Sequence, residues 1–347
     1  MKTVKVLAFT SLFWLCACEK TEPELAVFKE QMFVMGTIID VSIYGESEKK
    51  SQKMFHDLLK DFKYMQASWS PTRKGGLRRL NGLIALESPF TIGPGIKDMI
   101  EHSTQLSLQS EGLFNPALGK LIKLWKFSQE ELPKGPPPAA DAINKILAGN
   151  PKMTDLVITG LILESRTPDL AVDFGAYAKG YGVDKAIEYL KSQGVHNAII
   201  NAGGDLRAIG SKGKDAWHIG IRHPRENWAI ASIKIQADES VFTSGDYERF
   251  YEYEGKRYHH IIDPRTGYPA DQSTSVTVLH HNAAIADAAA TALFVAGPKD
   301  WQRIAKKMSV THVMLIDKNG KIFLTPEMQE RLQFTQPESL DITVVSH

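Results

Sequence analysis

Alternating and helical spacings of apolar residues both occur in the first third of the chain. Residues 37–45 alternate apolar with polar positions, which is the period-two pattern of a strand with one buried face. Residues 49–65 place apolar side chains three or four positions apart, which predicts an amphipathic helix. Residues 96–109 predict a second such helix, and Gly112 suits the position after its end.

From about residue 170, short strands alternate with helices. Helical patterns run over residues 179–193 and 283–296. Hairpin turns are predicted at Glu254-Gly255 and Asn319-Gly320. Because many strands are joined by hairpin-like connections, we expect an α+β (mixed α/β) fold in which largely antiparallel sheets pack with helices in two lobes.

The composition is that of a globular protein with a substantial core. Of the 347 residues 43% are hydrophobic, and 41 basic residues nearly balance 40 acidic ones. This near-neutral balance gives no electrostatic footprint for nucleic acid. An anionic ligand must therefore be held by a local site.

The first eighteen residues have the pattern of a secretory signal. Lys2 and Lys5 precede an apolar run of about a dozen residues, which is too short for a stable membrane-spanning helix. "LCAC", ending at Cys18, then resembles a bacterial lipobox, in which the last cysteine is lipidated; an ordinary signal peptide is the alternative. Both cysteines of the chain fall here. We therefore expect no disulfide and no thiol nucleophile in the mature protein, and a membrane anchor at Cys18.

The segment "ADAAATALFVAG" is the most informative helical pattern. Asp287 and Thr291 are four residues apart, so their oxygens lie on one face of a helix that is otherwise rich in alanine. Such a helix packs closely, and a carboxylate on it is costly unless it is paired or bound to a metal. Two hard oxygen donors suit Mg²⁺. The alternative is a structural ion pair between Asp287 and a nearby Arg or Lys.

Two glycine-containing segments are candidates for ligand contact. Residues 171–184 read as a strand, a turn and a helix start, where backbone N–H groups and Lys179 could hold a phosphate. Neither a Walker loop nor a GxGxxG motif is present there, and a simple connection is the alternative. Gly203-Gly204, at the end of an apolar strand, permits the close approach of a ligand or marks a bulge.

The segment "RYHHIIDPRTGYPA" combines two histidines, an aspartate and an arginine beside two isoleucines. It reads either as the rim of an active site or as a strand that ends in a turn with exposed histidines. Imidazole is the side chain suited to accept a proton near neutral pH, but deciding between the two interpretations needs the rest of the chain.

Taken in order, these segments resemble the ApbE family, the FAD:protein FMN transferases. The motifs are "MGT" at residues 35–37, "VDFGAYAKGYGVD", "NAGGDLRAIG", "TSGDYERFYEYEGKRYHHIIDPRTGYP" and "ADAAATALFVAG", and the resemblance covers about residues 30–330. It implies a Mg²⁺-dependent enzyme that binds FAD and transfers the FMN half to a threonine or serine hydroxyl of an acceptor protein, releasing AMP. Members are often lipid-anchored on the outer side of the bacterial inner membrane, which agrees with the lipobox.

The resemblance also implies roles for single residues. Mg²⁺ would be held by the side chains of Asp287 and Thr291 and by the main-chain carbonyl of Ala176. His260 would be the base for the acceptor hydroxyl, and Asp263 would orient that base or cap the turn. The residues expected to contact FAD are Met35, Trp69, Leu113, Phe114, Asn115, Asp173, Lys179, His260 and Ile261.

The expected organisation follows from these assignments. Residues 1–18 would be a lipoprotein signal peptide, 19–29 a tether, 30–335 the catalytic domain and 336–347 a C-terminal tail, with the flavin site between the two lobes. By strand alternation, His259 would point away from His260. The turn at residues 267–269 would then shape the rim where the acceptor docks.

Two other functions stay open. A Mg²⁺-dependent FAD pyrophosphatase would split FAD into FMN and AMP, with water in place of the acceptor hydroxyl. A non-catalytic lipoprotein would bind flavin as a store or carrier. For the transferase, the resemblance implies acceptors among the flavoprotein subunits of membrane electron-transfer complexes, met on the periplasmic side of the inner membrane.

Overall fold

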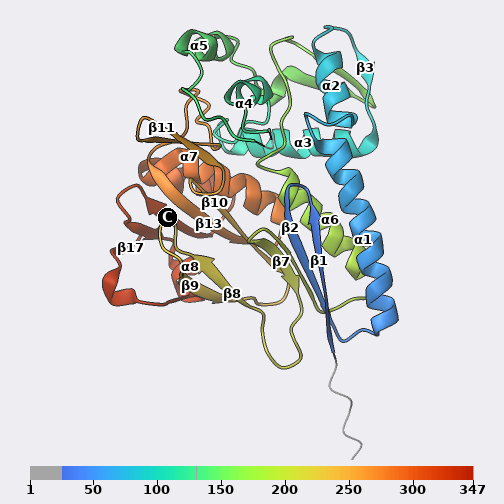
Figure 1. Cartoon of the computed structure of the whole chain (residues 1–347), viewed down its shortest axis with the longest axis vertical. Coiled ribbons are helices and arrows are strands. Elements are labelled where there is room, and N and C mark those ends of the chain that lie inside the picture. The colour runs from blue at the N-terminus through green and yellow to red at the C-terminus, as the bar shows by residue number, and fades with distance from the viewer. Residues whose placement is uncertain (1–25, 130, 347) are drawn as a thin grey trace, which may run out of the picture.

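A nine-stranded sheet forms the centre of the computed structural model, which describes residues 26–129 and 131–346 (Figure 1). Every neighbouring pair of strands is antiparallel except β15 and β17. In spatial order the strands are β1 (Val27–Val34), β2 (Thr37–Tyr44), β6 (Ala198–Ala202), β7 (Asp205–Ile209), β10 (Glu239–Gly245), β13 (Ser273–His280), β14 (His312–Asp317), β15 (Ile322–Leu324) and β17 (Ile342–Val344).

Three long helices cover one face of this sheet: α1 (Glu48–Trp69), α6 (Ala178–Ser192) and α7 (Ala283–Lys307). The apolar positions of β2 point toward them, and Val41 and Ile43 are fully buried. This helix-facing layer is the main hydrophobic core and includes the alanine-rich first half of α7. Small side chains there let α7 approach the sheet and α6 closely.

A smaller layer covers the other face. The strands β8 (His218–Arg222), β9 (Ala229–Lys234) and β16 (Leu332–Phe334) form a three-stranded sheet, and the short helix α8 (Pro326–Arg331) lies beside it. Their apolar side chains and those on this face of the large sheet form a second core, in which Leu206, Ile233 and Met314 are buried. The large sheet is therefore buried on both faces along its middle strands.

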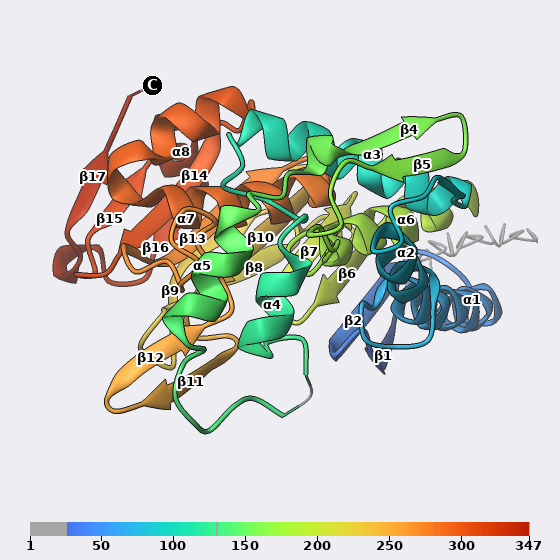
Figure 2. The ribbon, with the colours of Figure 1, turned by 90° about the horizontal axis from the view of Figure 1, so that it is seen from above.

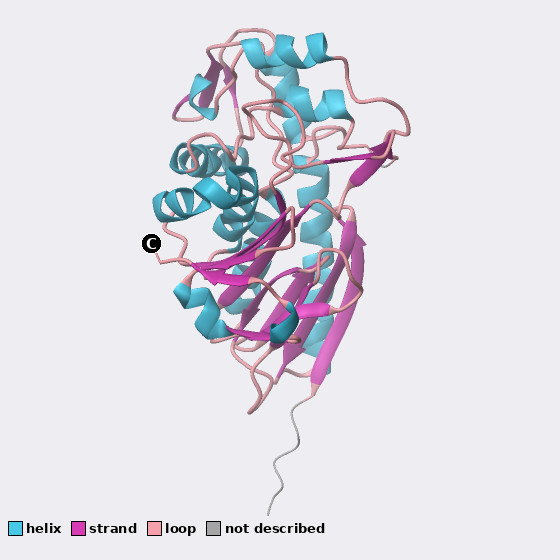
Figure 3. Ribbon diagram, turned by 90° about the vertical axis from the view of Figure 1, so that its left-hand side faces the viewer, coloured by secondary structure: helices cyan, strands magenta, loops and turns pink. Residues whose placement is uncertain are grey.

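A second lobe lies above the large sheet in Figure 1 and is made of short helices and small strands, as Figure 3 shows by colour. It holds α2 (Gly76–Ile84), α3 (Pro94–Gln109), α4 (Gly119–Trp125) and α5 (Ala140–Ala148), with β3 (Phe90–Thr91), β4 (Leu156–Thr159), β5 (Ile162–Ser165) and the 3₁₀ turn Met153–Asp155. Outside this lobe, a second 3₁₀ turn, Pro337–Ser339, lies between β16 and β17. The hairpin of β11 (Phe250–Tyr253) and β12 (Lys256–His259) packs on α4 and α5 through a third core around Trp125 (Figure 2).

Most of the predicted elements are present. The strand over 37–45, the helices over 49–65, 96–109 and 179–193, and both hairpin turns are confirmed. The helix predicted over 283–296 forms and is followed by a further helical stretch to Lys307 after a break at Gly297, where φ is 71° and Pro298 follows. The fold is the expected mixture of helices and mostly antiparallel sheets.

Two segments outside the expected domain limits join the large sheet. Strand β1 begins at Val27, inside the expected tether, and pairs along its whole length with β2. Strand β17, inside the expected C-terminal tail, pairs with β15. The expected signal peptide and Cys18 lie outside the described residues. Within the described ranges, no helix has the length and hydropathy needed to cross a bilayer.

Candidate active site

The helices α6 and α7 make close backbone contact where the expected metal ligands meet. A Cβ atom on Gly180 would lie 2.3 Å from the carbonyl oxygen of Ala283, so a larger residue does not fit. The Gly180 amide donates to Asp287 Oδ2 at 2.9 Å, although its regular helical acceptor would be the Ala176 carbonyl. Asp184 accepts from the amides of Ala283 and Ala284, both at 2.9 Å. These bonds fix α7 against the segment that carries Ala176.

Asp287 is a buried carboxylate with 7% of its surface exposed. Burial raises its pKa to about 7, and the nearby Asp205 carboxylate acts in the same direction, while Lys179 opposes the rise. One helical turn later, Thr291 Oγ1 lies 3.2 Å from Ser244 Oγ. Burial disfavours the charged form of this carboxylate, and a bound cation would offset that cost. A carboxylate, a hydroxyl and a carbonyl oxygen together form a donor set that fits Mg²⁺.

This set differs from the clusters by which metal sites are usually recognised. Among the described residues, no group of three or more His, Cys, Asp and Glu side chains is arranged to hold a metal. The set expected from the sequence has one carboxylate, one hydroxyl and one main-chain carbonyl. The remaining positions around Mg²⁺ would belong to phosphate and water oxygens.

Lys179 forms an ion pair with Asp205, the first residue of β7. Asp205 Oδ1 also accepts from the Thr243 amide at 2.7 Å, which fixes the carboxylate. Burial opposes the charge on Lys179, but Asp205, Glu248 and Asp287 outweigh it and raise the lysine pKa. Lys179 is therefore a fixed cation in a group of three acidic side chains.

Asp205 and Glu248 were not predicted from the sequence as site residues. Burial raises the pKa of Glu248 to about 7, against the effect of Lys179 and together with Asp205 and Asp287. Asp205 follows Gly203-Gly204 directly, so the glycine pair was a signal that pointed to the right place. The glycines themselves form the turn between β6 and β7, both with positive φ.

The same turn brings "MGT" to the site. Gly203 donates to the carbonyl of Ile38 at 3.0 Å, and a Cβ atom on Gly203 would lie 2.3 Å from Thr37 Oγ1. Gly203 is thus required for close approach of the chain, and the structure contains a tight turn there instead of a bulge.

Met35 and Trp69 come together on α6. Met35 lies in the turn between β1 and β2, with φ of 57°. A Cβ atom on Gly182 would be 3.7 Å from the Met35 methyl group and 3.5 Å from the Trp69 ring. Trp69, the last residue of α1, packs edge-on against Tyr181 with ring centroids 5.5 Å apart. These two expected flavin contacts therefore form one apolar patch.

The helix N-terminus of α6 is less open to phosphate than the sequence predicts. Ala178 donates to Phe174, Gly180 to Asp287 and Tyr181 to Tyr177, so three of the first four amides are already bonded. The expectation of a phosphate held by the amides is corrected for these three, because α7 and the preceding turn use them.

The segments 113–115 and 171–173 lie side by side. The Asp173 amide donates to Pro116 at 2.8 Å, and Gly119 donates to Ala171 at 2.7 Å. Phe114 is 2% exposed, and the Asn115 side chain is bonded to Pro151 and Ala117. Leu113 is buried as well. A ligand would therefore meet this segment mainly through its backbone.

Asp173 bonds within its own turn. Its Oδ1 accepts from the Gly175 amide at 2.7 Å, and burial raises the pKa of the carboxyl group. The turn leads into Ala176 and α6, so Asp173 and the expected metal-ligating carbonyl are placed by the same loop.

His260 follows β12 and is placed by the β11–β12 hairpin. The register pairs Phe250 with His259, which sets Arg249 opposite His260. The His260 amide donates to the Arg249 carbonyl at 3.0 Å, and the ring Nδ1 lies 3.3 Å from the same oxygen. Because a carbonyl only accepts, this bond places the proton on Nδ1 and leaves Nε2 as the acceptor.

His260 is neutral at physiological pH. Burial lowers its pKa to about 3, and the charge of Lys179 acts in the same direction. The charge of Lys179 thus helps to lower the pKa of His260 and opposes the rise in the pKa of Asp287. A bound anionic phosphate would raise the pKa of His260 again.

His259 and Asp263 have structural partners. His259 is 5% exposed; its Nε2 bonds to the Ala270 carbonyl at 2.8 Å and its Nδ1 accepts from Ile261, itself buried. Asp263 forms a two-oxygen ion pair with Arg265 and accepts from the Arg265 amide. Of the two expected roles for Asp263, the structure shows the turn cap; the residue that orients His260 is Arg249.

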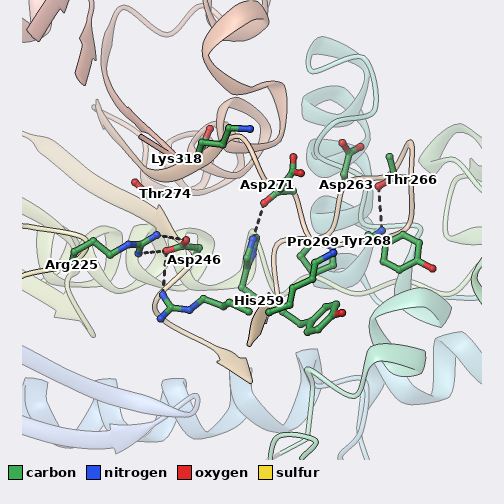
Figure 4. Close-up of a pocket in the computed structure, with 15 residues that line it drawn as sticks. Arg225, Asp246, His259, Asp263, Thr266, Tyr268, Pro269, Asp271, Thr274 and Lys318 are labelled. Atoms are coloured by element: carbon green, nitrogen blue, oxygen red, sulfur yellow. Dashed lines mark hydrogen bonds and ion pairs between the residues drawn. The ribbon is translucent and has the colours of Figure 1, made fainter. Parts of the chain in front are cut away.

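Two cavities open near these elements. One of about 510 Å³ is lined by α1, α3 and α6, including Trp69 and Tyr181. The other, of about 380 Å³, lies on the His259 side of β12 and is shown in Figure 4. Neither is lined by His260, Asp287 or Thr291, so the metal-ligand group and the base are not inside either of them.

Comparisons with known proteins agree with the arrangement of these motifs. The model of the ApbE family matches residues 35–315. A Rhodobacter capsulatus protein named FAD:protein FMN transferase is 40% identical over 307 residues, which are 88% of this chain and 58% of that protein. A Vibrio cholerae protein of the same name is 30% identical over 90% of this chain and 93% of its own length.

Solved structures are similar as well. The crystal structure of the ApbE protein from Thermotoga maritima has a TM-score of 0.80 at 28% identity, over 88% of this chain and 99% of that one. The flavin transferase ApbE from Vibrio cholerae has a TM-score of 0.78 at 28% identity over the same shares. On the matched sequence, the fold and the position of its motifs, this chain belongs to the ApbE family.

Proposed function

We propose that this protein is a Mg²⁺-dependent FAD:protein FMN transferase. It would move the FMN half of FAD to a threonine or serine hydroxyl of an acceptor protein and release AMP. The observation that carries the proposal is the position of Lys179. It pairs with Asp205 and precedes Gly180, whose amide bonds to the buried carboxylate of Asp287, and its charge helps to lower the pKa of His260. A dinucleotide pyrophosphate at this place would therefore have the Lys179 ammonium group as its cation and the His260 imidazole as the proton acceptor.

The atoms of the proposed reaction balance as follows. The acceptor oxygen forms a bond to the phosphorus of the FMN half, and the bond from that phosphorus to the bridging oxygen breaks. AMP leaves with the electron pair of that bond. The hydroxyl proton passes to Nε2 of His260, since Nδ1 is held by the Arg249 carbonyl.

Positioning and charge neutralisation supply most of the rate in phosphoryl transfer. Lys179 would neutralise phosphate charge, and Asp205 holds its ammonium group in place. Asp287, Thr291 and Ala176 would hold Mg²⁺, which supplies charge stabilisation on the phosphate oxygens when bound. Met35 and Trp69 offer the apolar surface on which a flavin ring could stack.

The proposed location rests on the N-terminal sequence. The basic residues, the apolar run and "LCAC" support lipidation at Cys18 and attachment to the periplasmic side of the inner membrane. Acceptors would then be flavoprotein subunits of membrane electron-transfer complexes, which share that face. Labelling of intact cells with a clickable fatty acid tests the anchor, because a Cys18→Ser variant should lose the label.

The activity is tested by incubating the protein with FAD, Mg²⁺ and a candidate acceptor. The expected result is an acceptor band that stays fluorescent after denaturation and gains the mass of FMN in mass spectrometry. AMP should appear in equal amount. FMN and AMP without a labelled acceptor would identify a pyrophosphatase, and FAD that stays uncleaved in Mg²⁺ would identify a carrier.

A further inference from the structure

A hydrogen bond between the two lobes is the strongest feature without an assigned role. Tyr177, which directly precedes α6, has its hydroxyl 2.8 Å from Nδ1 of His102. His102 lies in α3, a helix of the second lobe, whereas α6 covers the large sheet (Figure 1). The two residues are 75 apart in the sequence. This bond therefore ties the start of α6 to the other lobe.

Packing also holds the side chain of Tyr177. The residue is fully buried, and its ring centroid lies 5.5 Å from that of Tyr181 and 6.0 Å from that of Phe174. The His102 ring packs edge-on against it at 5.6 Å, and Phe114, an expected FAD contact, lies 6.4 Å away. A buried tyrosine hydroxyl needs a hydrogen-bond partner, and His102 supplies one. Packing thus limits the movement of the ring, and the hydrogen bond fixes its direction.

Tyr177 shares a peptide unit with one of the expected metal ligands. The carbonyl of Ala176 and the amide of Tyr177 belong to one planar trans group, in which the C=O and N–H bonds point in opposite directions. The Tyr177 amide donates to the Phe174 carbonyl at 2.9 Å. The position of Tyr177 therefore sets the direction in which the Ala176 carbonyl points.

The Ala176 carbonyl is available to a ligand because its regular helical donor bonds elsewhere. That donor is the Gly180 amide, which bonds to Asp287 Oδ2. The expected carboxylate ligand is thus positioned by Gly180, within the main lobe. The expected carbonyl ligand is positioned by Tyr177, whose hydroxyl is held from the second lobe.

We propose that His102 and Tyr177 are positioning residues for the metal site, and that their hydrogen bond orients the Ala176 carbonyl toward Mg²⁺. The inference rests on the metal ligands of the proposed function. Neither side chain touches the ion, because both act through the peptide unit of Ala176 and Tyr177. Loss of a group that orients a metal ligand typically weakens metal affinity by about 10–100-fold. Metal affinity would thereby depend on how the second lobe is held against α6.

Binding of Mn²⁺, which replaces Mg²⁺ and is visible by electron paramagnetic resonance, tests the inference without catalysis. The signal of free Mn²⁺ is followed in titrations of the full protein without FAD. Tyr177→Phe should raise the dissociation constant about tenfold. Tyr189→Phe is the matched control, because Tyr189 is also on α6 and its hydroxyl donates to Asp57 at 2.7 Å. Tyr189 lies about 18 Å along the helix from Tyr177, so this variant should keep the wild-type affinity.

A double variant separates positioning from stability. Tyr177→Phe should lower the melting temperature, because it leaves the buried side of His102 without its partner. His102→Phe/Tyr177→Phe should recover most of that loss, because both polar partners are replaced by apolar rings. The dissociation constant for Mn²⁺ should nevertheless stay about tenfold above that of the wild type. A double variant that recovers its Mn²⁺ affinity together with its melting temperature would overturn the inference.

Asp287→Ala and flavin transfer separate this inference from the proposed function. If Asp287→Ala loses Mn²⁺ while Tyr177→Phe binds it like the wild type, the metal site stands and the role of His102 and Tyr177 fails. If Tyr177→Phe binds Mn²⁺ more weakly but the wild type attaches no flavin to any acceptor, the inference stands and the proposed function fails. A wild type that binds no Mn²⁺ would overturn both the metal site and the inference.

Discussion

The two sides of the site hold their functional groups by different means. The helix side, formed by α6 and α7, carries charged groups in a buried environment: Asp287, Lys179 and the Asp184 carboxylate that caps α7. The hairpin side, formed by β11, β12 and the turn to Ala270, carries neutral imidazoles bonded to main-chain carbonyls. The helix side therefore depends on compensating charge, whereas the hairpin side depends on backbone register.

This difference assigns separate tasks to the two sides. Buried charges that are held by fixed partners are preorganised to stabilise charge on a ligand, and they need no rearrangement at the moment of reaction. A neutral imidazole with one nitrogen committed to a carbonyl is prepared to accept a proton on the other. Substitutions on the helix side should thus change metal and FAD dependence, and those on the hairpin side should change the chemical step.

Loss of the helix-side carboxylate should have the largest effect. Asp287→Ala removes the one carboxylate of the proposed metal site, and we expect flavin transfer to fall by a factor on the order of 10³ or more, since metal stabilisation contributes several kcal/mol. The rate is measured against Mg²⁺ concentration, with circular dichroism to verify the fold. A rate that keeps the wild-type Mg²⁺ dependence would remove Asp287 from the metal site.

The close contact of α6 with α7 should have the next largest effect, seen in stability. Gly180→Ala forces a Cβ atom against the Ala283 carbonyl, and we expect unfolding free energy to fall by about 1–3 kcal/mol. Gly82→Ala is the matched control, because Gly82 lies in α2 with nothing within 4 Å of the added Cβ. That change should be neutral or stabilise by up to about 1 kcal/mol.

Urea unfolding of both glycine variants provides the measurement. The contact between the helices is not tight if Gly180→Ala is as stable as Gly82→Ala. A loss of transfer activity in Gly180→Ala beyond the loss of folded protein would show that helix spacing also sets the position of Asp287.

On the hairpin side, acidification should lower the unfolding free energy through His259, by less than the two substitutions above change activity or stability. Burial lowers the pKa of His259 in the folded protein below its ordinary value of 6.5. The neutral His259 therefore contributes its full stabilisation above pH 6.5. This stabilisation is lost as the pH falls below 6.5, because the unfolded chain binds a proton at a higher pH than the folded chain does. We expect a loss on the order of 1 kcal/mol from this residue between pH 7 and pH 5.

Comparison of variants isolates this residue. The pH dependence of the unfolding free energy should be shallower in His259→Asn than in the wild type. His56→Asn, on the exposed face of α1, is the matched control for the loss of an imidazole. An identical slope in His259→Asn would mean that His259 is not held neutral by the fold.

Much of the helix side was visible in the sequence, because helical spacing alone places Asp287 and Thr291 on one face. The register of the hairpin could also be counted from the turn at Glu254-Gly255, and that count gives Arg249 as the partner of His260. Other features depend on contacts between distant segments. The Gly180–Asp287 bond joins residues 107 apart, and it is the reason that the Gly180 amide is not open to phosphate.

Turn chemistry explains the remaining differences. Asp263 lies two residues before Arg265, and a two-oxygen ion pair formed within the turn takes the carboxylate away from the histidine. Strands β1 and β17 lack the strong alternation of β2, and their place in the sheet is decided by the partners β2 and β15. Local pattern could not reveal either partner.

The transfer rate of His260→Ala, measured beside its FAD affinity, tests the central claim that this imidazole takes the proton at a site shared with Lys179 and Asp287. We expect the rate of flavin attachment to fall by about 10²–10⁴, the usual contribution of a general base, while FAD binds about as tightly as to the wild type. A variant that labels its acceptor at the wild-type rate would contradict the assignment of His260.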